Sequence, residues 1–322
     1  AAALALAAAL AVPAGVAAQP RALELRVDND QFAFTPGRDE RWYTSGAFLR
    51  AAFDAPAGAP DARLLSGWCA LSFACERDAR TVRVWSLGHR IFTPAFTGTE
   101  GPQPFDRPYA AALHAGWAVA AVGERSRRTL ELQLGTIGPG ALGEPVQNGL
   151  HRLIGQERAR GWDGQVRSQP LVQLGASRLD AWGGRGGADV VTRGALLLGN
   201  PLTQASLGAI LRVGRLPEGP TWPGEPALVR ETGAWLFAGA ELRAVARDAL
   251  VEGETAGYAS RVRREPRAGE LVAGASFGLV ADWRLELALS LRSVEFSTPV
   301  ETYPLRPQRI GSVVLRWSPP AR

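Results

Sequence analysis

The chain has 322 residues and a mass of 34.2 kDa, with 46% hydrophobic and 21% charged residues. This hydrophobic fraction is enough for a folded core, and the mean hydropathy of −0.05 excludes a bundle of membrane-spanning helices. The net charge of +5 is carried by arginine, because all 36 basic residues are Arg and none is Lys. Glycine and proline are frequent but follow no fixed period, which excludes a collagen-like fibre.

The first residues predict an export signal. Residues 1–12 are apolar and rich in alanine, form a stretch too short to cross a bilayer, and are followed by a site of small residues ending at Ala18. We therefore expect residues 1–18 to be a signal peptide, and residues 19–322 to form one mature domain.

The chain contains two cysteines, Cys69 and Cys75. An exported chain enters an oxidising compartment, where such a pair can form a disulfide. The spacing matches no zinc pattern, so we expect either a local disulfide or two free thiols.

Alternating apolar and polar residues, the pattern of β-strands, recur along the rest of the chain. Leu23, Leu25 and Val27 alternate with charged residues, and the same pattern recurs in residues 129–137 and 284–296. Twelve strands are predicted, at residues 22–29, 45–53, 81–92, 110–122, 129–137, 169–181, 189–199, 205–213, 234–247, 270–280, 284–296 and 309–317.

Two features favour an all-β transmembrane antiparallel up-and-down β-barrel over a soluble β-sandwich. The segments run for about ten residues, the length that a tilted strand needs to cross a bilayer. Short turns also alternate with longer connections rich in glycine and proline, as in outer-membrane barrels. Trp42, Trp68, Trp85, Trp222 and Trp235 fall near predicted strand ends, where aromatic belts lie, and ordinary packing is the equal alternative for each of them.

One short helix is predicted, in the connection after the fifth strand. It begins at Pro145, and an apolar face is formed at helical spacing by Val146, Leu150, Leu153 and Ile154. Gln147 and His151 are four residues apart, so they share a neighbouring face of this helix.

Candidate catalytic residues are few. Histidine is the side chain most easily poised as a base near neutral pH, and of the three histidines His89 and His114 lie in predicted strands, where a structural role is expected. His151 lies on the predicted helix. The oxygen-rich run Asp28-Asn29-Asp30 suits a hard cation such as calcium, but its residues are also ordinary in turns.

At this point the sequence resembles a known family. The motifs DND, YTSG, GHRIFTP, FDRPYA, IGPGALGEPVQNGLHRLIG and GWDGQ occur in the order in which they occur in the LpxR-type lipid A 3′-O-deacylases. The resemblance covers most of residues 22–200 and weakens in the last four strands.

The resemblance implies a twelve-stranded barrel, a monomer in the bacterial outer membrane, with a calcium-dependent esterase site at the extracellular rim. Its substrate is lipid A of lipopolysaccharide, and no nucleic-acid partner is expected. Residue by residue, the family's catalytic positions fall on Asn29, Asp30, Thr44, Gln147 and His151.

The resemblance also suggests ligands and departures. Asp30 and Glu157 are the expected calcium ligands. Family members can carry a substrate-binding Lys in the second outer loop, and Arg107 is the nearest basic residue that this chain offers. Gln31 follows the Asn-Asp pair where an acid can occur, which can change the affinity for calcium.

The expected mechanism is attack by a water molecule that His151 deprotonates, with calcium stabilising the oxyanion. Gln147 is expected to orient water or substrate. A Thr44 or Ser45 nucleophile is the competing mechanism, and the sequence contains no Gly-x-Ser-x-Gly elbow of an α/β-hydrolase. The remaining alternatives are an outer-membrane phospholipase-type esterase, a noncatalytic barrel or pore, and a soluble secreted β-sandwich.

Overall fold

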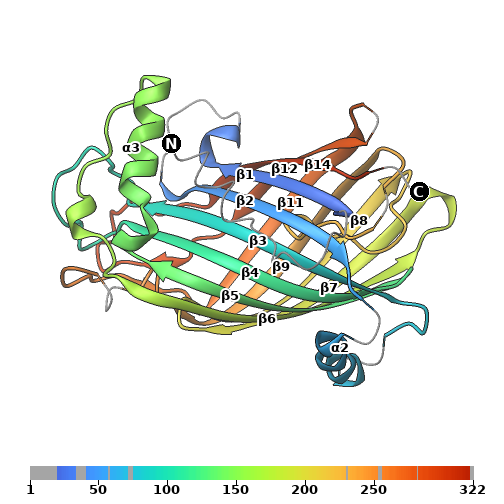
Figure 1. Ribbon diagram of the computed structural model, residues 1–322. Helices are drawn as coiled ribbons and strands as arrows, with labels where there is room; N and C mark the ends of the chain where they lie inside the picture. Colours follow the sequence, from blue (N-terminus) through green and yellow to red (C-terminus); the bar gives the residue numbers. More distant parts are fainter. Residues whose placement is uncertain are drawn as a thin grey trace.

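The computed structural model describes residues 20–33, 41–56, 59–71, 75–229, 231–252, 256–280 and 282–319, so the expected signal peptide lies outside the described residues. Twelve antiparallel strands close into a barrel (Figure 1). The barrel strands are β1 (Ala22–Asn29), β2 (Trp42–Asp54), β3 (Arg80–Thr93), β4 (Ala110–Val122), β5 (Ser126–Ile137), β6 (Gln169–Gly183), β7 (Ala188–Gly199), β8 (Leu202–Gly214), β9 (Trp235–Asp248), β11 (Arg267–Gly278), β12 (Trp283–Arg292) and β14 (Gln308–Trp317). The short strands β10 (Arg263–Arg264) and β13 (Phe296–Ser297) pair separately.

Neighbouring strands follow chain order, and β14 closes the barrel against β1. Leu23 near the start of β1 lies opposite Trp317 at the end of β14, so both termini of the barrel lie at one end, which we name the terminal end. The opposite end carries helix α3 (Gly143–Ile154), and we name it the loop end (Figure 1). Each predicted strand overlaps one barrel strand, which confirms the predicted architecture and excludes the β-sandwich.

The outer surface of the wall is apolar. Large side chains such as Leu207, Leu236 and Leu242 are 73%, 62% and 71% exposed, because alternate residues of each strand point outward. A broad exposed apolar surface of this kind suits lipid rather than water. No helix among the described residues combines the length and apolar character needed to cross a membrane.

The expected aromatic belt is only partly present. Trp85, like Trp182 and Trp283, is an exposed residue of a barrel strand near the terminal end. Trp42, Trp222 and Trp235 are buried instead, so for these three the packing alternative holds. Trp68 lies in the helix of residues 60–71 and Trp222 in the connection between β8 and β9, so neither belongs to a strand.

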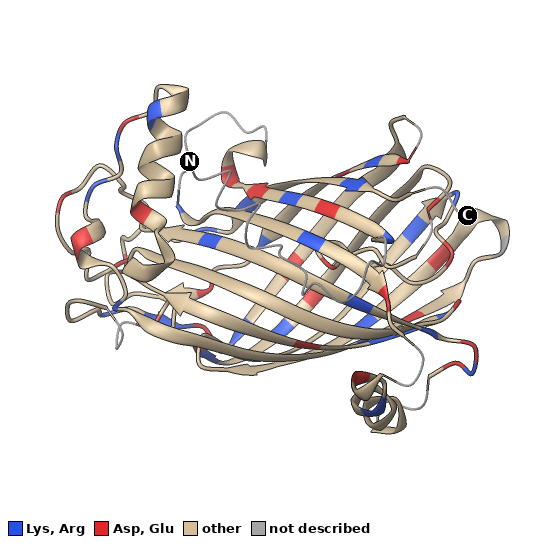
Figure 2. Ribbon diagram, viewed as in Figure 1, with Lys and Arg blue, Asp and Glu red and all other residues tan. Residues whose placement is uncertain are grey.

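The lumen contains a segment of the chain. Residues 215–234, described except for residue 230, connect β8 to β9, and we name them the lumen segment. Arginines from seven strands hydrogen-bond to it: Arg50, Arg80, Arg127, Arg193, Arg212, Arg284 and Arg316. Its Leu228 and Val229 pack against inward-facing apolar residues of the first four strands, including Val82 and Ala120. Charged residues lie along the strands as well as at their ends (Figure 2).

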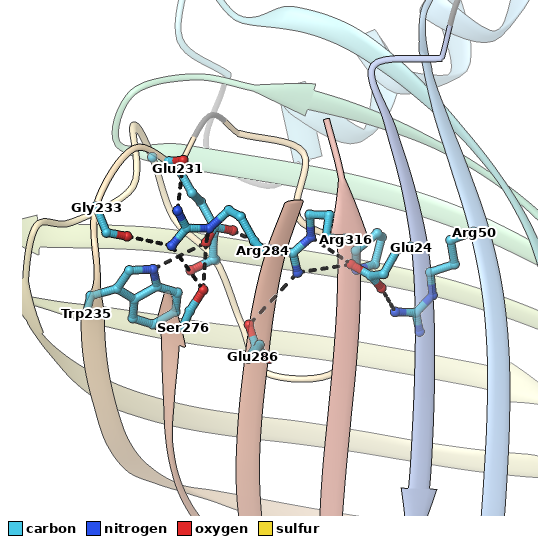
Figure 3. A network of polar contacts seen from close by, with 12 residues as sticks. Glu24, Arg50, Glu231, Gly233, Trp235, Ser276, Arg284, Glu286 and Arg316 are labelled. Atoms are coloured by element: carbon cyan, nitrogen blue, oxygen red, sulfur yellow. Dashed lines mark hydrogen bonds and ion pairs between the residues drawn. The ribbon is translucent and has the colours of Figure 1, made fainter. Parts of the chain in front are cut away.

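A continuous polar network joins the lumen segment to the barrel wall (Figure 3). Arg316 donates hydrogen bonds to Glu24 at 3.0 Å and to Glu231 of the lumen segment at 2.6 Å. Arg284 donates to the other carboxylate oxygen of Glu231 at 3.0 Å, and Arg50 donates to Glu24 at 2.6 Å. Buried charges need such partners, because an isolated ion in a site shielded from water is very costly.

A second helix, α2 (Pro60–Leu71), was not expected from the sequence, which predicted a helix only after the fifth strand. It lies outside the barrel at the terminal end (Figure 1). Leu65 packs with Val119 of β4 and with partly buried Trp117 and Leu130, and the disulfide between Cys69 and Cys75 closes the loop after α2. The terminal end therefore carries two long connections, the one containing α2 and the lumen segment, where outer-membrane barrels usually have short turns.

Candidate functional site at the loop end

Helix α3 has an inverted amphipathic arrangement. Its buried residues are Gly143, Gln147 and His151, which recur every four positions along one face. Its apolar residues, including Leu150 and Leu153, are exposed, the latter to 82%. The predicted apolar face is confirmed, but it points away from the protein, as in a helix at a lipid boundary.

The buried face of α3 meets the outer surface of the barrel near the loop end. Trp162, from the short helix η3 (Trp162–Gly164), packs with Ile91 of β3 and Ala111 of β4. A Cβ at Gly143 would lie 2.5 Å from Trp162 and 2.6 Å from the Cβ of Ala111. Glycine is therefore required here, because any side chain would push the helix off the wall.

His151 is oriented by the return segment that follows α3. Its Nδ1 lies 2.6 Å from the backbone carbonyl oxygen of Glu157. A carbonyl oxygen can only accept, so Nδ1 carries the proton and Nε2 is the basic nitrogen of the neutral ring. The Glu157 carboxylate itself is exposed, so the residue holds the histidine through its backbone.

Gln147 lies one turn before His151 and is 3% exposed. Its Oε1 accepts a hydrogen bond from the indole Nε1 of Trp162 at 3.0 Å. Its Nε2 is buried and has no hydrogen-bond partner among the described residues. A buried amide donor without a partner is destabilising, so its presence needs an explanation.

The oxygen-rich run lies at the loop end of β1. The strand ends at Asn29, and Asp30 begins the short helix η1 (Asp30–Ala33), so β1 does not continue through Asp30. Asn29 Oδ1 accepts a hydrogen bond from the backbone of Gln31 at 2.7 Å, and Asp30 Oδ2 accepts one from the backbone of Arg41 at 3.1 Å.

Strand register connects the two groups of candidate residues. Asn29 lies opposite Ser45, Ser45 opposite Ile91, and Ile91 opposite Ala111, on which α3 rests. With strands about 4.8 Å apart, Asn29 is roughly 14 Å from the position where α3 meets the wall. Thr44 lies at the register shift near the start of β2, and its hydroxyl is 2.7 Å from that of Thr93. The candidate residues thus gather at one side of the loop end.

Two residues with unfavourable backbone conformations lie on this side of the barrel. Among the described residues, two that are not glycine have positive φ: Trp42 at 63° and Leu142 at 61°. Trp42 begins β2 two residues before Thr44, and Leu142 directly precedes α3. Such residues typically cost about 1–3 kcal/mol each and cluster at functional sites.

Arg107 lies away from this surface. It is fully buried, its guanidinium lies 4.4 Å from the ring centre of Phe92, and its Nη2 donates to the Leu250 carbonyl at 3.1 Å. Burial lowers its pKa, and nearby Glu295, Asp248 and Asp106 act in the opposite direction. This arrangement fits a structural role rather than the expected contact with substrate.

Asp106, which the sequence did not single out, organises the same loop. Its carboxylate accepts hydrogen bonds from the indole of Trp42, the hydroxyl of Tyr303 and the backbone N–H groups of Ala95 and Arg107. Burial raises the pKa of Asp106, although the hydrogen bonds from Tyr303 and from the backbone of Ala95 and Arg107 act in the opposite direction. The FDRPYA motif contains this residue, but nothing in its spacing indicates four partners from three parts of the chain.

The expected calcium site was tested on its donor atoms. Within the described ranges, no group of three or more His, Cys, Asp or Glu side chains is arranged to hold a metal ion. Calcium prefers about six to eight oxygen ligands. The described oxygens of Asn29 and Asp30 do not complete such a set, so the described residues do not by themselves form a calcium site.

Known proteins resemble this chain in sequence and in fold. The model of the family described as outer membrane protein LpxR matches residues 2–318. LpxR from Salmonella typhimurium has the same fold, with a TM-score of 0.75 at 21% identity, covering 92% of this chain and 99% of that chain. The translocator domain of the autotransporter NalP from Neisseria meningitidis is more distant, with a TM-score of 0.41 at 11% identity, covering 92% of this chain and 86% of that chain.

No curated protein sequence matches the chain. The family match nevertheless spans nearly the whole chain, and the closed barrel agrees with it. The chain therefore belongs to the LpxR family of outer membrane proteins, the family of lipid A 3′-O-deacylases that its motifs resemble.

Proposed function

We propose that this protein hydrolyses the ester that joins the 3′ acyloxyacyl chain to lipid A, in the outer leaflet of the outer membrane. The observation that carries the proposal is the arrangement of α3, which buries Gln147 and His151 against the barrel wall and exposes Leu150 and Leu153. The two faces suit a substrate with a polar ester and long acyl chains. We expect a site at the loop end to lie at the extracellular rim, since both barrel termini lie at the opposite end.

In the proposed reaction, Nε2 of His151 removes a proton from water, and the resulting hydroxide attacks the ester carbonyl carbon. The negative charge that develops on the carbonyl oxygen is met by the NH₂ group of Gln147. Collapse of the tetrahedral intermediate breaks the bond to the sugar oxygen, which takes the proton back from His151. The products are a free acyloxyacyl acid and a sugar hydroxyl.

The backbone geometry supports the base assignment. The carbonyl of Glu157 holds the Nδ1–H of His151, so the ring cannot rotate without losing this hydrogen bond. It also stabilises the imidazolium that forms during the reaction, as an orienting acceptor does in other hydrolases.

Attack by Thr44 or Ser45 is the competing mechanism. The hydroxyl of Thr44 is buried and hydrogen-bonded to Thr93, an arrangement that does not favour it as a nucleophile. Ser45 lies in the register row between Asn29 and Ile91 and is partly accessible. A Ser45→Ala variant with normal turnover would reject the serine.

Calcium is part of the proposal and rests on the family resemblance. Asp30 and Glu157 are the residues that would hold the ion, although the described donors do not complete a site for it. We expect chelation with EDTA to abolish activity and calcium to restore it. Full activity in EDTA would remove calcium from the account without affecting the base assignment.

The function is tested by offering purified protein two substrates, hexa-acylated lipid A and a diacyl phospholipid. We expect mass spectrometry to show loss of one acyloxyacyl unit from lipid A and no change in the phospholipid. Hydrolysis of the phospholipid alone would favour a phospholipase-type esterase. Absence of both reactions, together with ion conductance in planar bilayers, would favour a pore, which the lumen segment argues against because its residues fill the lumen near the terminal end.

A further inference from the structure

Chemistry fixes the orientation of the Gln147 amide. An indole N–H is a donor only, so the atom of Gln147 that lies 3.0 Å from Trp162 Nε1 must be the carbonyl oxygen Oε1. The NH₂ group therefore points the other way. There it is buried and has no partner among the described residues. Trp162 thus decides which end of the amide is presented to the site.

Trp162 is itself held firmly. It is 2% exposed, its ring centre lies 4.8 Å from that of Tyr109, and it packs against the glycine that begins α3, Gly143. Such close contacts on several sides leave the indole no alternative position, so its N–H is a fixed reference for the amide.

The segment that carries Trp162 is clamped to α3. The Asn148 side chain donates to the carbonyl of Ala159 at 3.2 Å and accepts from its N–H at 2.8 Å. The same return segment supplies the Glu157 carbonyl to His151 and the Trp162 indole to Gln147. One short stretch of chain therefore orients both functional side chains of the helix.

We infer that Trp162 is a positioning residue that fixes the Gln147 amide, so that its NH₂ group presents a hydrogen-bond donor to the ester carbonyl oxygen of the substrate. The inference rests on the proposed function. Without the indole N–H, the amide can rotate and present its own oxygen, which repels the developing oxyanion. The unpartnered donor then has a reason: its partner is the substrate, and it is best matched in the transition state.

The test replaces Trp162 with phenylalanine, which keeps an aromatic ring but removes the N–H. We expect kcat on lipid A to fall about tenfold while KM changes less than about twofold, since one neutral hydrogen bond is lost and binding of the acyl chains is not. Tyr109→Phe is the matched control, because its hydroxyl donates to Thr97 and not to Gln147. The control should keep its kcat.

A double-mutant cycle separates positioning from a general structural effect. If Trp162 acts through Gln147, Trp162→Phe should cause no further loss in a Gln147→Ala background. An equal loss of kcat in both backgrounds would overturn the inference, as would normal kcat in Trp162→Phe alone.

Thermal denaturation by circular dichroism establishes that the variants are folded. If Trp162→Phe is destabilised, 3-benzothienylalanine at this position replaces the N–H with sulfur in a ring system of the same shape, and the same loss of kcat is expected. Wild-type protein that leaves lipid A intact would overturn the proposed function and this inference together. Active wild type with an equally active Trp162→Phe variant would overturn the inference alone.

Discussion

The lumen and the α3 side of the barrel both contain buried polar groups, but these groups differ in their hydrogen-bond partners. In the lumen, the Glu231 carboxylate accepts from Arg284, Arg316 and the Ser276 hydroxyl. Beside α3, the NH₂ group of Gln147 is buried without a partner among the described residues. In the lumen, Arg127 has an unpartnered Nε but still donates through both of its Nη atoms, which indicates a structural role. Neither hydrogen of the Gln147 NH₂ group has a partner in the described parts of the chain, which suits a partner that comes from outside the fold.

Energetics support this distinction. A buried polar group left without a hydrogen bond costs about 1–3 kcal/mol, and residues with positive φ that are not glycine add to this. Trp42 and Leu142, which have positive φ, lie beside the candidate site. The α3 side therefore combines a buried donor that has no partner among the described residues with residues of positive φ, which is the pattern of a region shaped by function.

The largest effect on stability is expected in the lumen. Glu231→Ala leaves Arg284 and Arg316 without their shared carboxylate, and breaking a buried ion pair costs about 3–5 kcal/mol. Urea unfolding in detergent, followed by the gel mobility of the folded barrel, measures this loss. Glu218→Gln, an exposed position in the same segment, is the control and should be neutral. Equal stability of the two variants would contradict a structural role for the network.

Beside α3 we expect the opposite result, a large loss of activity with little loss of stability. Gln147→Glu keeps an oxygen facing Trp162 but replaces the NH₂ donor with a second acceptor. We expect kcat to fall about 100-fold, the usual loss for one oxyanion donor, with little change in unfolding. Steady-state kinetics and urea unfolding of one preparation give both values. A Gln147→Glu variant that is unstable but fully active would show that Gln147 has a structural role and not a catalytic one.

The smallest effect concerns α2. A hydrogen bond from Arg83 holds the pKa of Asp61 below its ordinary value of 3.8. A lowered pKa in the folded state gives stability that is present above the ordinary value and is lost as the pH falls through the folded-state pKa. We expect less than about 1 kcal/mol from this partly exposed pair.

Hydrogen exchange in α2 between pH 6 and pH 3 tests this expectation. Protection should decrease as Asp61 is protonated, and Asp61→Asn should remove the pH dependence. Protection that falls equally in Asp61→Asn would show that another group is responsible.

The sequence predicted the barrel well, because alternation along a strand reports directly which side chains face out. It missed α2, since a short apolar run such as residues 64–71 gives no clear helical period. It missed the lumen segment, because the sequence of a proline-rich connection does not indicate whether the connection lies inside or outside the barrel. Its Glu231, for example, binds Ser276, Arg284 and Arg316, which are 45, 53 and 85 residues away along the chain.

The sequence also predicted part of the candidate site. The spacing of Gln147 and His151 places both on one helical face, as observed. The role of Trp162 could not be read from the GWDGQ motif, because contact with Gln147 depends on how the return segment folds back. Arg107 was offered for its charge alone, and charge does not reveal burial.

The most direct test of the account analyses lipid A extracted from a host whose own lipid A is hexa-acylated. The host expresses the wild type, His151→Ala or His114→Gln. The His114 variant is the control, because this histidine faces the lumen. Mass spectrometry should show loss of one acyloxyacyl unit with the wild type and the His114 variant. The His151 variant should be folded in the outer membrane and leave lipid A intact, since removing a general base costs about 100-fold to 10,000-fold in rate. Normal deacylation by the His151 variant would contradict the account.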